Sequence, residues 1–469
     1  MKIAVVGAGM IGLCTATLLA QDGHEVTVVD RDEQSAPDPS GAWNGWQRTG
    51  VAQFRLAHFL LSRFRVVAGA ELPDLVSGLD DAGACHYNVI ANIPDEMKGG
   101  ARPDDDRFDV VTARRPVAEA VVSRLAEGTP GVTVRRGHAV ASLLTGAPSR
   151  PEVPHVTGVT LDNGDHVAAD LVVDSAGRRS PLPRWLDSIG AKPLHQEVDD
   201  SGFVYFGRHF ASSDGSLPAM IGPLKQDCDS IGYLTLPADN GTWSVVITAS
   251  SEDAALRRLT DPDKWAAVVR MLPLAAHWID APPIDDRVAV MAKIEDRIRD
   301  LAPDGLPVAT GVTAVGDAWS CTNPSLGRGM SIGLMHAVAL RDYLRDQPAD
   351  PWETAAGWAD ITRETCEPWF RTTRHYDALR LQEIQATIEG RPFTTDDPAW
   401  RLEHALGAVA LQSGDNLRGL MSIAMMLRTP EEFLEDRPFA EQVLADAEPL
   451  LDSQPPLGPT REQLLAAVA

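Results

Sequence analysis

Residues 3–30 read IAVVGAGMIGLCTATLLAQDGHEVTVVD, and this stretch decides the fold. Residues 3–6 form a short apolar run that is typical of a strand buried on both faces. The glycine-rich turn 7–12 and a helix-compatible segment follow, and a second β-rich run at 26–29 ends in Asp30. We therefore predict a strand, a tight turn, a helix and a second strand, the context in which a G-x-G-x-x-G turn binds a dinucleotide.

Each glycine of this turn has its own expected role. Gly7 permits the turn, Gly9 lets the backbone approach a pyrophosphate, and Gly12 allows the helix to pack closely on the strand. The N–H groups at the helix start then receive phosphates, and Asp30 accepts hydrogen bonds from a ribose. The competing interpretation is a glycine-rich turn that binds no ligand.

The composition excludes several classes of protein. The chain has 469 residues, which predicts two or three domains. Its formal net charge of −24 disfavours nucleic acids and anionic membrane surfaces as partners. Five scattered cysteines argue against a disulfide framework and against a metal site. The glycines within residues 3–20 argue against a signal peptide, and no run reaches the roughly 20 apolar residues of a membrane span, so we expect a cytoplasmic protein.

Two later segments extend the pattern. Residues 156–169 predict a β-hairpin around an Asn-Gly turn, which leads into LVVDSAG at 171–177. Further along, AVGDA at 314–318 ends an expected strand, and NPSLGRGM at 323–330 opens an expected helix. The chain thus carries three glycine-rich turns, each of which follows a strand.

These turns resemble those of the FAD-dependent monooxygenases of the aromatic hydroxylase and the styrene or polyether epoxidase type, which have a glutathione-reductase-type FAD fold. The resemblance covers most of residues 1–350. It implies that Asp317 contacts the ribityl and pyrophosphate region of FAD, that residues 327–330 lie by the pyrimidine edge of the flavin, and that Pro324 lies beside the isoalloxazine. Backbone N–H groups and the positive end of a helix would stabilise anionic reduced flavin there.

A further match is RTGVAQFRLAH at residues 48–58, which is similar to the R-x-G-V-P-Q-x-R-x-x-H segment of epoxidase-like members. Arg115 resembles the family arginine near the FAD phosphates. The chain departs from the family pattern at Ala52, which replaces a proline, and at Trp319 and Ser320, which replace Ala-His. These departures remove no group essential to FAD binding, and we expect the last two to reshape the substrate side of the flavin.

Some of these residues have structural alternatives. Arg55 is equally well explained as a surface charge and Asp174 as a turn residue, while His58 is expected to be a packed or surface histidine. The predicted cofactor-binding residues are Gly7, Gly9, Met10, Ile11, Gly12, Asp30, Arg31, Arg48, Gln53, Arg115, Asp174, Gly177, Gly316, Asp317, Gly327, Arg328, Gly329 and Met330. For catalysis, the resemblance implies positioning by the backbone at Pro324, Gly327 and Gly329, with no side-chain acid or base.

A substrate domain is expected between the second and third turns. Residues 202–210, 231–236 and 242–248 predict β-hairpins, whose sheet would pack one face and line a cavity over the flavin with the other. Strand register decides which aromatic side chains face that cavity, and the pattern alone leaves it open. The candidates for substrate contact are Phe203, Tyr205, Tyr233, Trp243 and Trp319.

Residues 351–469 are helical in pattern. Thr429 is an expected N-cap. Residues 417–427 predict a helix whose methionines fill a core stripe rather than contact lipid, and residues 452–460 predict a linker before a short final helix.

The predicted fold class is α/β, with a Rossmann-like FAD-binding domain, an inserted β-sheet substrate domain and a helical C-terminal region. The expected segments are 1–75, 111–190 and 301–350 for the FAD-binding domain, 76–110 and 191–300 for the substrate domain, and 351–469 for the C-terminal region.

The resemblance implies an FAD-dependent monooxygenase that inserts one oxygen atom from O2 into a small organic, secondary-metabolite substrate. Epoxidation or hydroxylation would proceed through a flavin C4a-hydroperoxide, with electrons from NADH or NADPH, taken directly or through a flavin reductase. A flavin halogenase is an alternative, disfavoured because the W-x-W-x-I-P motif is absent, and an FAD-dependent dehydrogenase or reductase is another. A lipid carrier with a dinucleotide fold is the alternative outside enzymes. The substrate, the electron source and the oligomeric state stay open.

Overall fold

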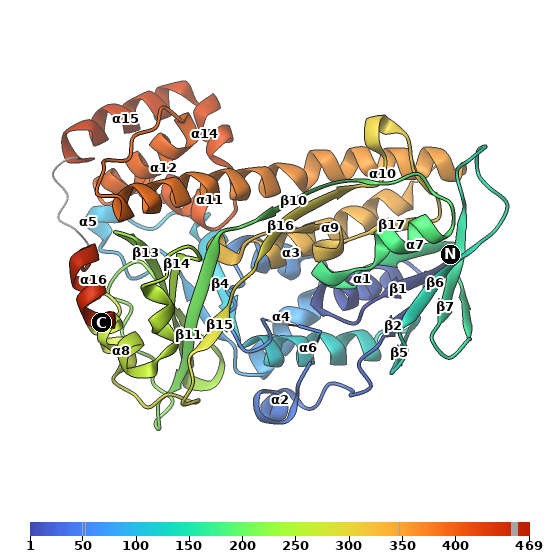
Figure 1. Ribbon diagram of the computed structural model, residues 1–469, viewed down its shortest axis with the longest axis horizontal. Helices are drawn as coiled ribbons and strands as arrows, with labels where there is room; N and C mark the ends of the chain where they lie inside the picture. Colours follow the sequence, from blue (N-terminus) through green and yellow to red (C-terminus); the bar gives the residue numbers. More distant parts are fainter. Residues whose placement is uncertain (49, 52, 347, 452–457) are drawn as a thin grey trace.

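The computed structural model describes residues 1–48, 50–51, 53–346, 348–451 and 458–469. In Figure 1 a parallel sheet with its helices lies on the right, an antiparallel sheet lies on the left, and helices of the C-terminal region run across the top. The predicted fold class is confirmed: the chain combines a Rossmann-like parallel sheet, separate antiparallel sheets and a helical C-terminal region. Ala52, one of the departures from the family pattern, lies outside the described residues.

The Rossmann-like sheet has five parallel strands in the order β17-β9-β1-β2-β5, so it draws on widely separated parts of the chain. The strands predicted at 3–6 and 26–29 are confirmed as β1 and β2, which pair along their whole length. The bounds are β1 Lys2–Val6, β2 Glu25–Asp30, β5 Val132–Arg136, β9 Leu171–Asp174 and β17 Val312–Ala314.

Both faces of this sheet are covered, as its continuous apolar strands predict. Val5 and Val173 belong to a core shared with α1, α3, α4, α6 and α9. On the opposite face, Ala4 and Val172 pack against Val159 and other side chains of β6, β7, β8 and α7. The hairpin predicted at 156–169 is confirmed as β7 and β8. The bounds are α1 Met10–Gln21, α3 Ser62–Glu71, α4 Pro73–Asp81, α6 Arg115–Gly128, α7 Leu182–Ser188, α9 Gly329–Arg345, β6 Val140–Thr145, β7 Val156–Leu161 and β8 His166–Ala168.

The large antiparallel sheet has the order β12-β13-β14-β11-β15 and confirms the predicted hairpins. Its side chains alternate between two environments, as the strand period requires. Phe206 and Ile247 face a core completed by α8 and α16, whereas Tyr205 and Val246 face the opposite side together with Ile294. The bounds are β11 Phe203–Ala211, β12 Lys225–Cys228, β13 Ile231–Pro237, β14 Thr242–Ser250, β15 Ala289–Met291, α8 Pro262–Arg270 and α16 Arg461–Val468.

Smaller elements connect the two large sheets. A three-stranded antiparallel sheet has the order β10-β16-β18, and β3 pairs with β4. The bounds are β3 Cys85–Asn88, β4 Asp109–Thr112, β10 His195–Asp200, β16 Glu295–Asp300, β18 Ser320–Cys321, α2 Pro39–Gly45 and α5 Asp95–Lys98.

The C-terminal region is helical, as predicted, and Thr429 forms the expected N-cap within a full capping box with Glu432. The helix predicted at 417–427 instead spans Gly414–Ala424 as α13, because Met426 adopts a left-handed φ of 62° and the N–H of Leu427 turns back to the carbonyl of Ser422. Of the predicted linker, residues 452–457 lie outside the described chain, and the final helix is confirmed as α16. The bounds of the other helices are α10 Pro351–Thr365, α11 Glu367–Ile388, α12 Pro398–Val409, α14 Pro430–Glu435 and α15 Arg437–Leu451.

The methionines at the end of α13 serve packing. Met425 and Met426 are buried in the same core as Trp369 of α11, which agrees with the predicted core stripe. Throughout the part of the chain that the structure describes, no helix is both long enough and apolar enough to cross a membrane.

A buried ion pair joins the large antiparallel sheet to helix α6, which packs on the Rossmann-like sheet. Asp239, in the turn between β13 and β14, is fully buried and accepts hydrogen bonds from Arg114, the N-cap residue of α6. Its Oδ2 lies 2.6 Å from Nη2 of Arg114, and its Oδ1 lies 2.7 Å from the backbone N of the same residue. The Arg114 guanidinium also stacks 4.8 Å from the ring centre of Trp43.

Replacing this carboxylate should destabilise the protein strongly. We expect Asp239→Ala to lower the free energy of unfolding by about 3 kcal/mol, because it leaves the Arg114 guanidinium buried without its partner. Urea unfolding of the purified protein measures the effect. Asp360→Ala removes the carboxylate of an exposed ion pair with Arg363 and should change stability far less. Equal losses in the two variants would contradict this interpretation.

Candidate cofactor and substrate site

The three glycine-rich turns meet at one cavity of about 450 Å3, which lies between the carboxyl ends of the parallel strands and the large antiparallel sheet. Ligands of open parallel sheets bind at such strand ends. Of the predicted cofactor-binding residues, Asp174, Gly316 and Arg328 lie behind the cavity wall. The predicted residues that line it are Gly7, Gly9, Met10, Ile11, Gly12, Asp30, Arg31, Arg48, Gln53, Arg115, Gly177, Asp317, Gly327, Gly329 and Met330, together with Pro324.

Backbone packing joins the first turn to the second. Gly7 has a φ of +106°, and a Cβ atom there would lie 2.5 Å from the carbonyl oxygen of Ser175. A Cβ atom on Gly12 would lie 2.1 Å from the carbonyl oxygen of Gly7. At Gly9, by contrast, nothing lies within 4 Å of the Cβ position. A side chain at Gly7 or Gly12 would therefore disturb the fold, whereas one at Gly9 would enter the cavity.

Two helix N-termini point at this cavity. α1 starts at Met10 and α9 starts at Gly329, and in the described chain neither helix has a side chain that caps its first turn. Free N–H groups and the helix dipole make such ends favourable for negative charge. The arrangement fits FAD, since one end suits a pyrophosphate and the other suits the charge of a reduced flavin ring.

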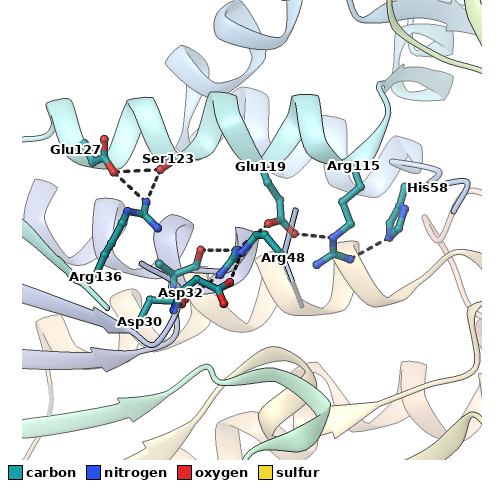
Figure 2. Close-up of polar contacts among 10 residues, drawn as sticks. Asp30, Asp32, Arg48, His58, Arg115, Glu119, Ser123, Glu127 and Arg136 are labelled. Atoms are coloured by element: carbon teal, nitrogen blue, oxygen red, sulfur yellow. Dashed lines mark hydrogen bonds and ion pairs between the residues drawn. The ribbon is translucent and has the colours of Figure 1, made fainter. Parts of the chain in front are cut away.

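Arg48 organises the acidic residues at the end of β2, as Figure 2 shows. Its guanidinium lies 2.9 Å from Asp30, 2.8 Å from Asp32 and 2.8 Å from Glu119, and only 7% of the residue is exposed. Asp30 also accepts a hydrogen bond of 2.5 Å from the N–H of Ala8. Arg48 therefore fixes the carboxylate that would meet a ribose, and would act on the cofactor mainly through Asp30.

Arg115 and Glu119 lie one helical turn apart on α6, and Figure 2 shows Glu119 above Arg48 and Arg115 beside His58. Arg115 donates to Glu119 over 2.6 Å and to Nε2 of His58 over 2.9 Å. Because Nε2 of His58 accepts this bond, Nδ1 carries the proton and donates to the carbonyl of Leu56 over 3.0 Å. Burial and the Arg115 charge lower the pKa of His58 to about 3, so it is a neutral, packed residue of the cavity wall.

The two strand-end aspartates have different surroundings. Asp317 lines the cavity, and burial raises its pKa although Arg115, Arg178 and Arg297 act in the opposite direction. Asp174 is fully buried behind the wall and accepts hydrogen bonds from Oγ of Ser180 and from the N–H of Ala176. Its contacts are those of a turn residue, the structural alternative for this position.

The substrate side of the cavity is mainly apolar. Its wall on the antiparallel sheet consists of Tyr205, Leu234, Val246, Met291 and Ile294, and Lys225 is paired with Asp227 over 2.9 Å at its edge. Ala424, the last residue of α13, and Met425, which follows it, also line the cavity. Arg63 holds that turn in place through bonds of 2.8 Å to each of the carbonyls of Met426 and Leu427.

Strand register explains which aromatic candidates reach this wall. Tyr205 lines the cavity, and Phe203 lies on the same face of β11 but packs against Ile294. Tyr233 and Trp243 lie on the opposite face, in the core with α8, where the indole N–H of Trp243 donates to the carbonyl of Trp278 over 2.7 Å.

Trp319 lies in the wall of a different cavity of about 660 Å3 beneath α10, next to Trp358. Its ring centre is 4.7 Å from that of His336. The glycine-rich turns line the smaller cavity, and we therefore place the cofactor there.

Several cavity residues are absent from the predicted set. Arg178 and Arg179 follow Gly177 directly and line the cavity, and a basic pair right after the second turn is a signal that could have found them. Met425 comes from the C-terminal region, and no local pattern distinguishes it from a core methionine. Arg55, which resembles a family arginine, donates to the carbonyls of Trp43 and Trp46 behind the wall.

Comparisons with known proteins agree with this geometry. The family model described as FAD dependent oxidoreductase matches residues 2–89. Among curated relatives, Protein Rv3254 of Mycobacterium tuberculosis is 28% identical over 371 residues, which cover 73% of this chain and 72% of that protein. Squalene monooxygenase of Mus musculus is 24% identical, over 76% of this chain and 56% of that enzyme.

Solved structures share the fold at low identity. PqsL of Pseudomonas aeruginosa, a probable FAD-dependent monooxygenase, superposes with a TM-score of 0.58 at 19% identity, over 83% of this chain and 99% of that one. Klebsiella pneumoniae HpxO, in a complex with FAD, superposes with a TM-score of 0.56 at 16% identity, over 91% and 98% of the two chains.

The family model matches the N-terminal part of the chain, where the first glycine-rich turn borders the cavity, so this part resembles the FAD-dependent oxidoreductases. Within that class, the chain has the fold of the FAD-dependent monooxygenases, as its glycine-rich turns imply.

Two glycines of the first turn should separate cofactor binding from folding. Gly9→Val should fold with the thermal midpoint of the FAD-free wild-type protein yet lose FAD binding, since its side chain fills the space over the turn. Gly12→Val should lower the thermal midpoint itself, because its Cβ atom meets the carbonyl of Gly7. Thermal unfolding and FAD titration of both variants measure the two effects. Full cofactor occupancy in Gly9→Val would show that the pyrophosphate lies elsewhere.

Proposed function

We propose that this protein is an FAD-dependent monooxygenase that uses O2 to insert one oxygen atom into a small organic substrate, by epoxidation or hydroxylation. The observation that carries the proposal is the continuity of the cavity. The same space is bounded by three glycine-rich turns on one side and by the apolar side chains of the antiparallel sheet on the other. A flavin held by the turns would thus face a substrate held by the sheet.

The residues of the chain have two tasks in such a reaction. The turns and the N-termini of α1 and α9 bind FAD, which when bound supplies the redox chemistry that activates O2. Leu234, Val246, Met291, Ile294 and Met425 form a wall that positions an apolar substrate and keeps water out. Pro324, Gly327 and Gly329 would position the flavin edge through the backbone.

The electron source, the metabolic role and the location complete the proposal. Electrons would come from NADH or NADPH, either bound transiently or delivered through a flavin reductase. A role in secondary metabolism and a cytoplasmic location follow from the family resemblance and the composition. A halogenase, a flavin dehydrogenase or reductase and a lipid carrier are the competing functions, since one fold serves several chemistries.

The decisive experiment combines spectroscopy with turnover. We expect the purified protein to show the visible spectrum of bound FAD and to oxidise NADH or NADPH, alone or with a flavin reductase. With an accepted substrate, heavy-isotope O2 should appear as one labelled oxygen in the product. Gly9→Val is the matched control and should show none of these signals.

Other outcomes would favour the competing functions. A preparation that neither binds FAD nor consumes reduced flavin would contradict the proposal and favour a carrier. Reduction of the flavin by an organic substrate without O2 would indicate a dehydrogenase, and a product that forms only with halide would indicate a halogenase.

A further inference from the structure

Helix α11 supports the loop at the proposed flavin edge from behind. Trp369, Thr373 and Asp377 are spaced four residues apart on α11 and therefore share one face. The Arg328 guanidinium donates to Thr373 over 3.1 Å and lies 5.7 Å from the ring centre of Trp369. Asp377 contacts Ser325 and Asn323 of the same loop. The C-terminal region thus holds the segment that contains Pro324.

Asp377 uses its two oxygens for different partners. Its Oδ1 accepts a hydrogen bond of 2.6 Å from the hydroxyl of Ser325, which lines the cavity. Its Oδ2 accepts a bond of 3.0 Å from the side-chain amide of Asn323. The ionised carboxylate orients that amide with its nitrogen toward Asp377, and the amide oxygen accepts a bond of 2.8 Å from the hydroxyl of Tyr205. Asn323 is further anchored through its N–H, which donates to Asp296 over 2.6 Å.

The surroundings of Asp377 disfavour the ionised form of its carboxyl group. The residue is only 2% exposed, and in the described ranges no lysine or arginine forms an ion pair with it. Burial raises the pKa of Asp377 to about 7, partly offset by the bonds from Ser325 and Asn323.

The titratable groups that face Asp377 come from four other elements. Tyr205 is on β11, Lys225 on β12, Asp296 on β16 and Arg328 at the start of α9. The charge of Asp296 adds to the effect of burial, and that of Lys225 opposes it.

In the observed arrangement, protonation of Asp377 places the proton on Oδ1. With the Asn323 amide in this orientation, Oδ2 faces an N–H group, which can only donate. A protonated Oδ1 donates to Ser325, so the serine oxygen becomes the acceptor and its own hydrogen is released toward the cavity. The ionised acid has the opposite effect, since the hydrogen of Ser325 is then held by Asp377 and its oxygen faces the cavity as an acceptor.

We propose that Asp377 is a positioning residue that sets the direction of the Ser325 hydrogen bond at the cavity wall. With Asp377 ionised, Ser325 accepts from a hydroxyl or N–H of the bound molecule. With Asp377 protonated, Ser325 donates to a carbonyl or an oxyanion. The inference rests on the proposed function only in taking this cavity as the site where flavin and substrate meet.

Infrared spectroscopy of the protein, recorded with and without FAD, tests the proposal without turnover. Between about pH 9 and about pH 5, the wild-type protein should gain the carbonyl band of a carboxylic acid with a midpoint near neutral pH. Burial also raises the pKa of Glu403 to about 7 and that of Asp296 to about 6, so the Asp377 component is read from the difference between wild type and Asp377→Asn. Ser325→Ala should keep this component at a shifted frequency, since the acid loses its hydrogen-bond partner. Asp296→Asn is the matched control and should keep the component at the same frequency with a lower midpoint, because the charge of Asp296 raises the pKa of Asp377. A difference spectrum without a near-neutral carbonyl component, or a component that is the same in Ser325→Ala, would overturn the proposal.

Stability supplies an independent readout. A carboxyl with a raised pKa binds its proton more tightly in the folded chain, so its contribution to stability is lost as pH rises from about 4 to about 7. The thermal midpoint of wild-type protein relative to Asp377→Asn should therefore fall across this range. A constant difference would contradict the assignment of the proton to Asp377.

Ligand binding tests the consequence at the cavity. The affinity of the wild-type protein for FAD or for an accepted substrate should change by up to about tenfold with a midpoint near neutral pH, the value of one hydrogen bond. The change should vanish in both Asp377→Asn and Ser325→Ala, and its persistence in either would contradict the proposal. If FAD did not bind at any pH, the proposed function would fail, whereas the infrared result on the protein alone would still decide the role of Asp377.

Discussion

The site depends on the close contact of backbone atoms between turns that are far apart in the sequence. Gly7 packs on the carbonyl of Ser175, Gly12 packs on the carbonyl of Gly7, and Gly333 of α9 packs on Ile11. Any side chain at these glycines would push β1, β9 and α9 apart. The cavity is the space left at the ends of these elements, so its shape follows from contacts that no larger residue permits.

Buried arginines serve this site in two opposite ways. Arg48 is surrounded by carboxylates, and its planar guanidinium fixes their orientation. Arg328 forms no ion pair within the described part of the chain, and its Nε atom has no partner there, while Asp377, Glu403 and Glu431 act on its charge without pairing with it. In a chain with a net charge of −24, nearby carboxylates thus offset the charges of both arginines.

The local pattern of the sequence predicted the glycine-rich turns, their strands and the hairpins, because each of these elements depends on a few adjacent residues. It did not predict which aromatic residues face the cavity, because Tyr205, Tyr233 and Trp243 differ only in strand register. The end of α13 was misplaced because the left-handed conformation of Met426 is set by its packing and not by its residue type. The sequence did not predict a role for Asp377 for a similar reason. Asp377 contacts Ser325 only because α11 packs against the loop before α9, and the two residues are about 50 positions apart in the sequence.

The position of Met425 also constrains how the protein is made. The wall that Met425 completes with Ala424 otherwise comes from residues 6–330, and the strand β17 inserts into the parallel sheet only after residue 314 is available. A nascent chain therefore cannot enclose the cavity until translation has passed residue 425, even though the first glycine-rich turn leaves the ribosome near the start of synthesis. Closure of the cavity accordingly follows the synthesis of residue 425 and does not accompany the folding of the first glycine-rich turn.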